Sequence, residues 1–284
     1  MTIKTIKEEW AVIPNKIAVV IMAFKGDDSC LRQCLRGLEE QIKKGYNLEI
    51  HILDDANNPL NPDDYKGYHY RKTFFPRNKN LNGVACTLGM LMEMLRIARE
   101  TRAEYILKVD SDMFIRSLDR FLKPIKEDRN LVLGFKLNPQ MNYVAGVTYL
   151  LPTIGLYNAI RGFNDWFKNE SENEDSFIKH CPEDWAITRC VAQTNNFPLV
   201  QWDNSEKPQN WLMSPFNFLE VENLEEINPL SFCKCSMYDF VNFGNRYEIT
   251  EDTKIGQYLN EMDSREIAGY LMEKFIDFDL LNQF

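Results

Sequence analysis

The sequence predicts an α/β fold, in which a mostly parallel sheet is flanked by helices on both faces. Apolar segments of strand length alternate along the chain with longer segments that have helical periodicity. The first apolar run, Ile17–Phe24, is nearly continuous, as expected of a strand that is covered on both faces. At 284 residues with 44% hydrophobic residues, the chain can also bury a large core.

The composition excludes several classes of partner. A formal net charge of -9 argues against nucleic acid as the main partner and leaves no basic stripe for an anionic membrane. The first residues form no apolar signal region, and no stretch approaches 18 uncharged apolar residues, which predicts a cytoplasmic protein without an integral membrane segment. The seven scattered cysteines are expected to be reduced thiols.

The first half of the chain reads as alternating strands and helices. After the first strand, the patterns predict in order a loop at Lys25–Asp28, a helix at Ser29–Lys44, a strand at Leu48–Asp54, a short strand near Tyr68–Phe75 and a long helix at Val84–Arg102. Short units of this kind are typical of a largely parallel sheet.

The centre of the predicted sheet is a buried strand, Tyr105–Val109, that runs into two aspartates. In an extended backbone Asp110 and Asp112 would point the same way, with Ser111 facing away, and could share one hard divalent cation. The alternative is an acidic strand-end turn with solvated aspartates, which leads into a helix at Ser117–Glu127.

A further strand is predicted at Leu131–Lys136, and the polar residues that follow the strands are expected at one rim. Ligands of such sheets bind beyond the carboxyl ends of the strands. This rule places Asp54 and Asp55, which end one strand, on the same rim as Asp110 and Asp112.

A second group of acidic residues lies in the segment Cys181–Cys190. Pro182 with Glu183 and Asp184 after it can be read as an ordinary helix start, in which acids complement the helix dipole. In the functional interpretation, the dipole holds one carboxylate ionised as a general base near the rim.

Together these segments resemble the GT-A glycosyltransferases, most closely the inverting, family-2-like branch. The resemblance covers roughly residues 16–192. Its matching pieces are, in order, Val19–Asp28, Asp54–Asp55, Asn82–Gly83, Asp110–Asp112 and Glu183–Asp184.

The resemblance implies a donor site at the rim. Asp54 or Asp55 would contact the nucleotide base, Asp110 would lie near the ribose, and Asp112, with Asp110, would hold Mn²⁺ or Mg²⁺ on the diphosphate. The implied donor-binding set also includes Phe24 and Ser111. The loop after the second strand, Ala56–Pro59, departs from the small polar loop usual in the family.

The resemblance also implies the chemistry on the acceptor side. Asp184 would deprotonate the acceptor hydroxyl, with Glu183 supporting it. A nucleoside diphosphate needs a divalent cation to become a good leaving group, and the attacking alcohol needs a proton acceptor.

The predicted function is therefore metal-dependent transfer of a sugar from a nucleotide-sugar, expected to be a UDP-sugar, to a hydroxyl of a saccharide or another acceptor. The enzyme would be hexosyltransferase-like and inverting. One alternative is a sugar nucleotidyltransferase, although the usual Gly-rich phosphate loop is missing after the first strand. The other is a non-catalytic nucleotide-binding protein of the same fold.

The predicted domain organisation is a GT-A domain at 1–230 and a helical appendage at 231–284. Within the domain, a nucleotide half is expected at about 16–115 and an acceptor half at about 116–230. Residues 251–284 have an amphipathic helical pattern and an excess of acids, which disfavours docking on a membrane. This tail is therefore expected to pack on the domain or on a partner chain, and a homo-oligomer is possible.

Overall fold

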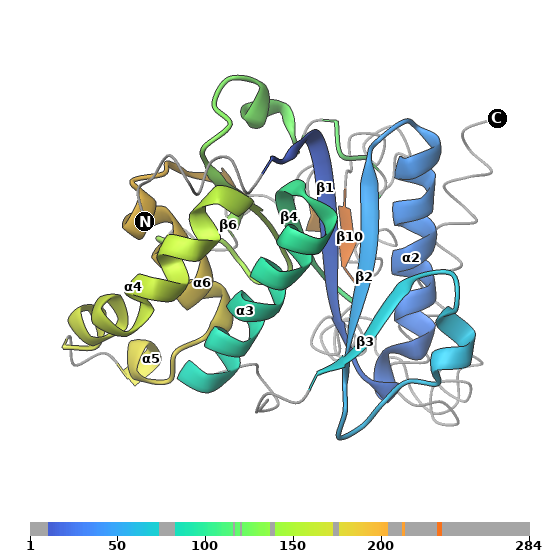
Figure 1. Cartoon of the computed structure of the whole chain (residues 1–284), viewed down its shortest axis with the longest axis horizontal. Coiled ribbons are helices and arrows are strands. Elements are labelled where there is room, and N and C mark those ends of the chain that lie inside the picture. The colour runs from blue at the N-terminus through green and yellow to red at the C-terminus, as the bar shows by residue number, and fades with distance from the viewer. Residues whose placement is uncertain are drawn as a thin grey trace, which may run out of the picture.

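A computed structural model of the chain describes residues 11–73, 83–115, 117–119, 121–136, 140–172, 176–203, 212–213 and 232–234. A seven-stranded sheet runs through the molecule with helices on both faces (Figure 1). The predicted class, α/β with a mostly parallel sheet, is confirmed. Within the ranges given above, no helix is both long and apolar enough to cross a membrane.

The main sheet sets the position of the acidic rim. Its strands are β1 (Ile13–Ala23), β2 (Leu48–Asp55), β3 (His69–Thr73), β4 (Ala103–Asp110), β6 (Val132–Lys136), β7 (Thr148–Pro152) and β8 (Leu199–Asp203). They lie in the order β3-β2-β1-β4-β7-β6-β8. All neighbours are parallel except β7, which is antiparallel to β4 and to β6. The carboxyl ends of β1, β2 and β4 therefore meet at one edge, where Ala23 pairs with Asp54 and Met22 pairs with Asp110.

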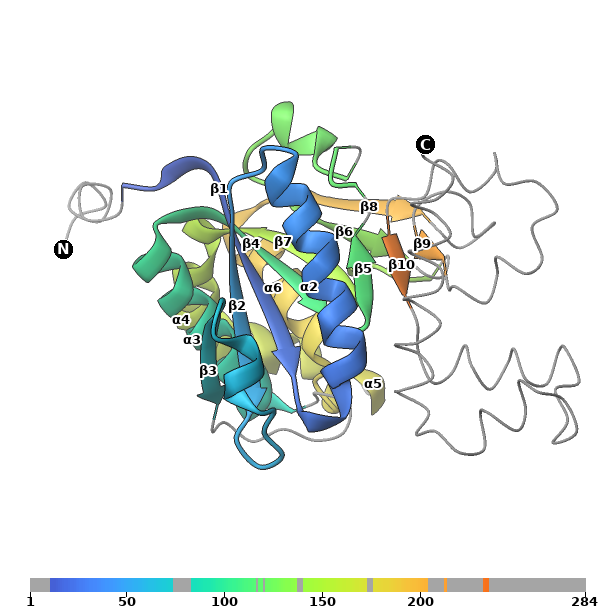
Figure 2. The same cartoon turned by 90° about the vertical axis from the view of Figure 1, so that its right-hand side faces the viewer.

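The helices cover the two faces unequally. They are α2 (Asp28–Lys43), α3 (Val84–Thr101), α4 (Thr153–Ser171), α5 (Ser176–Lys179) and α6 (Glu183–Asn195). Figures 1 and 2 show α2 on one face, with α3, α4 and α6 on the other. Alternate residues of β1 supply both cores, since Val19 packs in the cluster that contains Leu31 of α2, and Val20 in the cluster that contains Met90 of α3.

Most elements of the first half lie where the sequence predicts them. The strands and helices expected before Asp110 appear as β1, α2, β2, β3, α3 and β4, with ends shifted by a few residues. The loop at Lys25–Asp28 contains a short 3-10 helix, η1 (Lys25–Asp27), and another, η2 (Pro62–Tyr65), lies in the loop after β2.

Two expectations around the acidic motif were wrong. The backbone is not extended through Asp112, because Ser111 and Asp112 form a turn between β4 and β5 (Met113–Ile115). The helix at Ser117–Glu127 is also wrong, since the described part of that segment holds turns and a 3-10 helix, η3 (Lys123–Lys126). Pro124 has no N–H to give to an α-helix, and it lies at the start of η3.

The second half was predicted less completely. Neither β7 nor α4 was predicted from the sequence, and together they span Thr148–Ser171. A small sheet in the order β5-β10-β9 joins β5 to β9 (Leu212–Met213) and β10 (Phe232–Lys234). The appendage predicted at 231–284 lies outside the described residues apart from β10, so the domain boundary stays a prediction.

Candidate active site

The turn that carries Asp112 is fixed by contacts between β5 and α2. Gly37 allows the close approach, since a Cβ there would lie 2.9 Å from the backbone N of Ile115. The buried amide of Gln41 then donates to the Ile115 carbonyl at 3.3 Å and accepts from the Leu118 N–H at 3.2 Å. The chain after Asp112 is therefore held on α2 by packing and by hydrogen bonds.

Asp110 and Asp112 lie close together at this turn despite the change of backbone direction. The Cys34 thiol lies 3.6 Å from the Asp110 carbonyl oxygen. Its pKa is raised well above the ordinary value, first by burial and then by the negative charges of Asp112 and Asp110. Two carboxylates that act on one thiol offer hard oxygen ligands of the kind Mn²⁺ and Mg²⁺ take, so the donor set fits the expected cation.

A buried lysine, Lys108, binds the Asp110 carboxylate. Lys108 is 1% exposed, and its ammonium donates to Asp110 Oδ1 and to the carbonyl of Gly146. Because side chains two apart in a strand share a face, Lys108 and Asp110 point the same way from β4. Lys108 was not among the predicted site residues, although a single lysine within an apolar strand is a signal that the sequence contains.

Gly146 links this pair to the start of α6. Its N–H donates to Asp184 Oδ2 at 2.9 Å, while its carbonyl accepts from Lys108. A Cβ on Gly146 would lie 3.2 Å from Asp184 Cβ and 3.3 Å from its Oδ2. The missing side chain therefore leaves room for the carboxylate. A continuous polar chain runs Asp110–Lys108–Gly146–Asp184, and we call it the polar chain below.

Asp184 lies in the first turn of α6, which starts after Pro182. Its Oδ1 accepts the Trp185 N–H at 2.8 Å, so each carboxylate oxygen binds one backbone donor. Burial nevertheless raises the pKa of Asp184, and the N–H groups of Trp185 and Gly146 offset only part of that effect. A carboxylate with a raised pKa is a stronger base.

Glu183 is more deeply buried than Asp184, at 5% exposure. Burial raises its pKa to about 7, while the positive charge of Lys108 opposes the shift. The hydroxyl of the buried Tyr149 donates to Glu183 Oε1, and the Lys108 ammonium lies 5.7 Å from the Tyr149 ring centroid. The structure thus brings Glu183 to the polar chain through Tyr149, another residue that sequence reasoning missed.

The acidic pair at the end of β2 is built differently. Asp54 is fully buried, and both carboxylate oxygens accept from the Leu60 N–H at 3.1 Å. The Tyr70 hydroxyl donates to the same carboxylate. Asp55 is partly exposed and accepts the Asn57 N–H at 3.0 Å. Asp54 therefore holds the loop after β2 to β3, and Asp55 is the member of the pair that faces outward.

The remaining predicted donor-binding residues lie at the same edge. Phe24 follows β1 directly and is partly exposed, and its N–H donates to Asp27 Oδ2 at 3.2 Å. The Lys25 N–H donates to the Asn58 carbonyl at 2.9 Å, which joins the loops after β1 and β2. Ser111 is 8% exposed. The residues predicted for the donor side thus all end or follow β1, β2 and β4.

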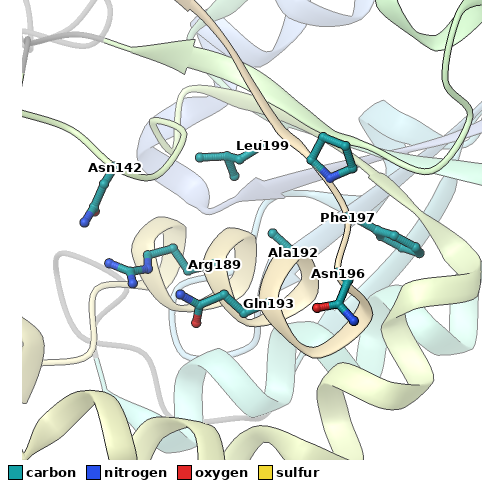
Figure 3. A pocket seen from close by; sticks show the side chains of 8 residues that line it. Asn142, Arg189, Ala192, Gln193, Asn196, Phe197 and Leu199 are labelled. Carbon is teal, nitrogen blue, oxygen red and sulfur yellow. The ribbon is translucent and has the colours of Figure 1, made fainter.

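A separate cavity of about 510 Å³ lies along the second half of α6 (Figure 3). Its lining is formed by Asn142, Arg189, Ala192, Gln193, Asn196, Phe197, Pro198 and Leu199. Leu199 begins β8 and pairs with the first residue of β6, so this part of the cavity lies toward the amino end of those strands. None of the predicted site residues lines the cavity, and we do not place the chemistry there.

Comparisons with known proteins give matches among solved structures. No family model matches the chain, and no curated protein matches it significantly. The chain is similar to the glycosyltransferase GlyE of Streptococcus pneumoniae TIGR4 at 11% identity and a TM-score of 0.48, covering 93% of this chain and 64% of the GlyE chain, which is less than two thirds of its length.

Two further solved structures are similar at the same level. The galactosyltransferase LgtC, in complex with donor and acceptor sugar analogues, matches at 11% identity and a TM-score of 0.47, over 83% of this chain and 98% of that one. A glycosyltransferase involved in glycosylation of the major capsid of PBCV-1 matches at 12% identity and a TM-score of 0.45, over 83% and 100% of the two chains. At such identities, the activity of this chain has to be argued from its own residues.

Proposed function

We propose that this chain is a metal-dependent, inverting GT-A glycosyltransferase, which moves a hexose-type sugar from a UDP-sugar to a hydroxyl of a saccharide or another acceptor. The observation that carries the proposal is the polar chain. It joins the acidic turn after β4 to the first turn of α6. Carboxylates that could bind a cation are therefore connected, at one edge of the sheet, to a carboxylate that could accept a proton.

The donor side of the proposal rests on Asp110 and Asp112. A bound Mn²⁺ or Mg²⁺ would neutralise negative charge on the leaving diphosphate. Lys108 holds Asp110 Oδ1, which fixes the direction of that carboxylate. Asp112, in the turn, would be the main protein ligand of the cation. The partly exposed Asp55 is the member of its pair that we assign to the uracil base.

The acceptor side rests on Asp184. Its carboxylate is oriented by two backbone N–H groups, from Gly146 and Trp185. It would take the proton of the acceptor hydroxyl as the oxygen attacks the anomeric carbon. The bond from that carbon to the diphosphate oxygen breaks on the opposite face, which inverts the configuration. The raised pKa of Asp184 suits this role, since a general base works best when its pKa lies near the working pH.

Binding and turnover test this proposal separately. UDP titrated calorimetrically into the full chain should bind in the presence of Mn²⁺ and lose that metal dependence in Asp112→Asn. Asp128→Asn is a matched control, because the exposed Asp128 lies next to Arg129, which binds Glu104 at the opposite end of β4. A panel of nucleotide-sugars should then show slow hydrolysis of one donor. Metal-dependent UDP affinity that survives in Asp112→Asn would refute the metal assignment, and UDP binding without hydrolysis of any donor would favour a non-catalytic binding protein.

A further inference from the structure

Three side chains on the edge of the sheet form a group that has no part in the proposed transfer reaction. Glu49 and His51 lie two residues apart on β2, and His69 pairs with His51 on the edge strand β3. Residues two apart on a strand share a face, and paired residues on adjacent strands do as well. Both histidines and Glu49 therefore project from the same side of the sheet.

The metal-binding atoms of the three side chains lie close together. Nε2 of His51 lies 3.1 Å from Glu49 Oε1, and Nε2 of His69 lies 3.5 Å from the same oxygen. In the described part of the chain, this is the one group of three His, Cys, Asp or Glu ligands whose atoms all lie within 4.8 Å of one another. The two imidazole rings are stacked, with centroids 4.6 Å apart, so the exposed His69 ring has to rotate for both rings to bind one ion.

The two spacings to Glu49 Oε1 match the coordination geometry of zinc. Ligand bonds of 2.0–2.1 Å to a tetrahedral Zn²⁺ place neighbouring ligand atoms about 3.3 Å apart. Two of the observed separations fall on either side of that value. Two imidazoles with one carboxylate are also a donor set that suits Zn²⁺ and its late first-row neighbours better than Mg²⁺ or Ca²⁺.

The surroundings leave this group accessible. The side chain of His69 is 64% exposed, that of Glu49 is 24% exposed and that of His51 is 9% exposed. Lys16 pairs with Glu49 at 2.7 Å, but it contacts Oε2, the oxygen that does not face the histidines. Solvent can therefore reach a fourth coordination position, while burial holds the His51 side chain in place.

We propose that Glu49, His51 and His69 bind one Zn²⁺, which clamps the edge strand β3 onto β2. Edge strands pair on one side only, so a bond between side chains adds a connection that the backbone of β3 lacks. His51 precedes Asp54 by three residues, roughly 10 Å along an extended strand, so this site is distinct from the proposed donor site and does not depend on it.

The test compares metal binding by matched variants of the full chain after treatment with a chelator. Zn²⁺ should bind the wild type with a component that weakens at least tenfold in His69→Ala and in Glu49→Gln, measured calorimetrically. His180→Ala is the control, because His180 is an exposed histidine outside the group, and it should retain that component. Both test variants alter side chains that are at least partly exposed, so the fold should survive.

Two further measurements keep the result specific. Co²⁺ bound at this site should give ligand-field bands without a thiolate charge-transfer band, which separates it from the cysteines. Zn²⁺ should also raise the Tm of the wild type and of Asp112→Asn, but not that of His69→Ala. The proposal is overturned if Zn²⁺ binds His69→Ala as tightly as the wild type, if the Co²⁺ spectrum shows thiolate ligation, or if Zn²⁺ does not bind at all and Glu49 serves only as a hydrogen-bond partner of His51.

Discussion

Two aspartate pairs end strands on either side of β1, and they serve the molecule in different ways. At the end of β2, the Asp54 carboxylate is buried and binds the Leu60 N–H and the Tyr70 hydroxyl. At the end of β4, Asp110 binds a buried lysine that leads on to the start of α6. Equivalent positions in a parallel sheet thus support a loop in one case and connect two parts of a candidate site in the other.

The largest effect is expected at Asp184, which ends the polar chain on α6. Asp184→Asn should lower the rate of sugar transfer by about 100- to 10,000-fold, the usual contribution of a general base. Because a base acts mainly in the transition state, the affinity for UDP should change little. Initial rates at saturating donor, measured with UDP titrations, check both parts. Turnover close to the wild-type rate would remove Asp184 from the mechanism and leave Glu183 as the next candidate.

Removing the positive charge of Lys108 should destabilise the polar chain where it starts on β4. Lys108→Met leaves Asp110 without its buried partner, which should cost about 3 kcal/mol of unfolding free energy, the low end for a broken buried pair, because Asp110 is 26% exposed. Urea unfolding followed by circular dichroism measures the loss. Lys66→Met is the control, because Lys66 forms an exposed pair with Asp63 and such pairs contribute little. A Lys108→Met protein as stable as the control would show that the pair does not hold the site.

Alanine substitutions of Asp54 and Asp55 should affect two different properties, stability in the first case and UDP binding in the second. Asp54→Ala leaves the buried Leu60 N–H and the Tyr70 hydroxyl without their acceptor, which should cost about 1–3 kcal/mol of unfolding free energy. Asp55→Ala should instead weaken UDP binding by about 1–3 kcal/mol and leave stability nearly unchanged. Urea unfolding and UDP titration of both variants provide the measurements. The reverse pattern would make Asp54 the base-contacting residue.

A further prediction concerns the pH dependence of stability and Glu183. Burial raises its pKa to about 7 in the folded protein, above the ordinary value of 4.5. The folded state therefore holds a proton that the unfolded state releases, and stability falls as pH rises from about 4.5 through 7. The slope from this one group is at most about 1.4 kcal/mol per pH unit. Glu183→Gln should flatten the fall in urea midpoints across this range, and an unchanged slope would contradict the raised pKa.

The sequence predicted the parts of the fold that rest on local patterns. The apolar run of β1 and the helical period of α2 and α3 were enough to place these elements, and the parallel arrangement put Asp54 and Asp110 at one edge. The turn at Ser111–Asp112 could not be read in this way, because the anchoring of β5 by Gly37 and Gln41 fixes it from a distant part of the chain.

The unpredicted residues of the site share a physical reason. Lys108 acquires its role from Gly146, and Gly146 acquires its role from Asp184, each 38 positions further along the chain. The partners of a lysine in a strand and of a glycine in a loop cannot be identified from the sequence, because they come together only when β7 pairs with β4 in the folded chain. Local periodicity therefore identified both ends of the polar chain but not the residues that connect them.

The pairing of β1 has a consequence for the order in which the molecule forms. Ile17 pairs with Leu48 across one helix, but it also pairs with Tyr105, which lies much further along the chain. Closing the longer loop costs more conformational entropy, and contacts between distant segments slow folding. We therefore expect the βαβ unit of β1, α2 and β2 to assemble first and β4 to join it later, so that Asp54 would be held in place before the polar chain from Asp110 to Asp184 forms.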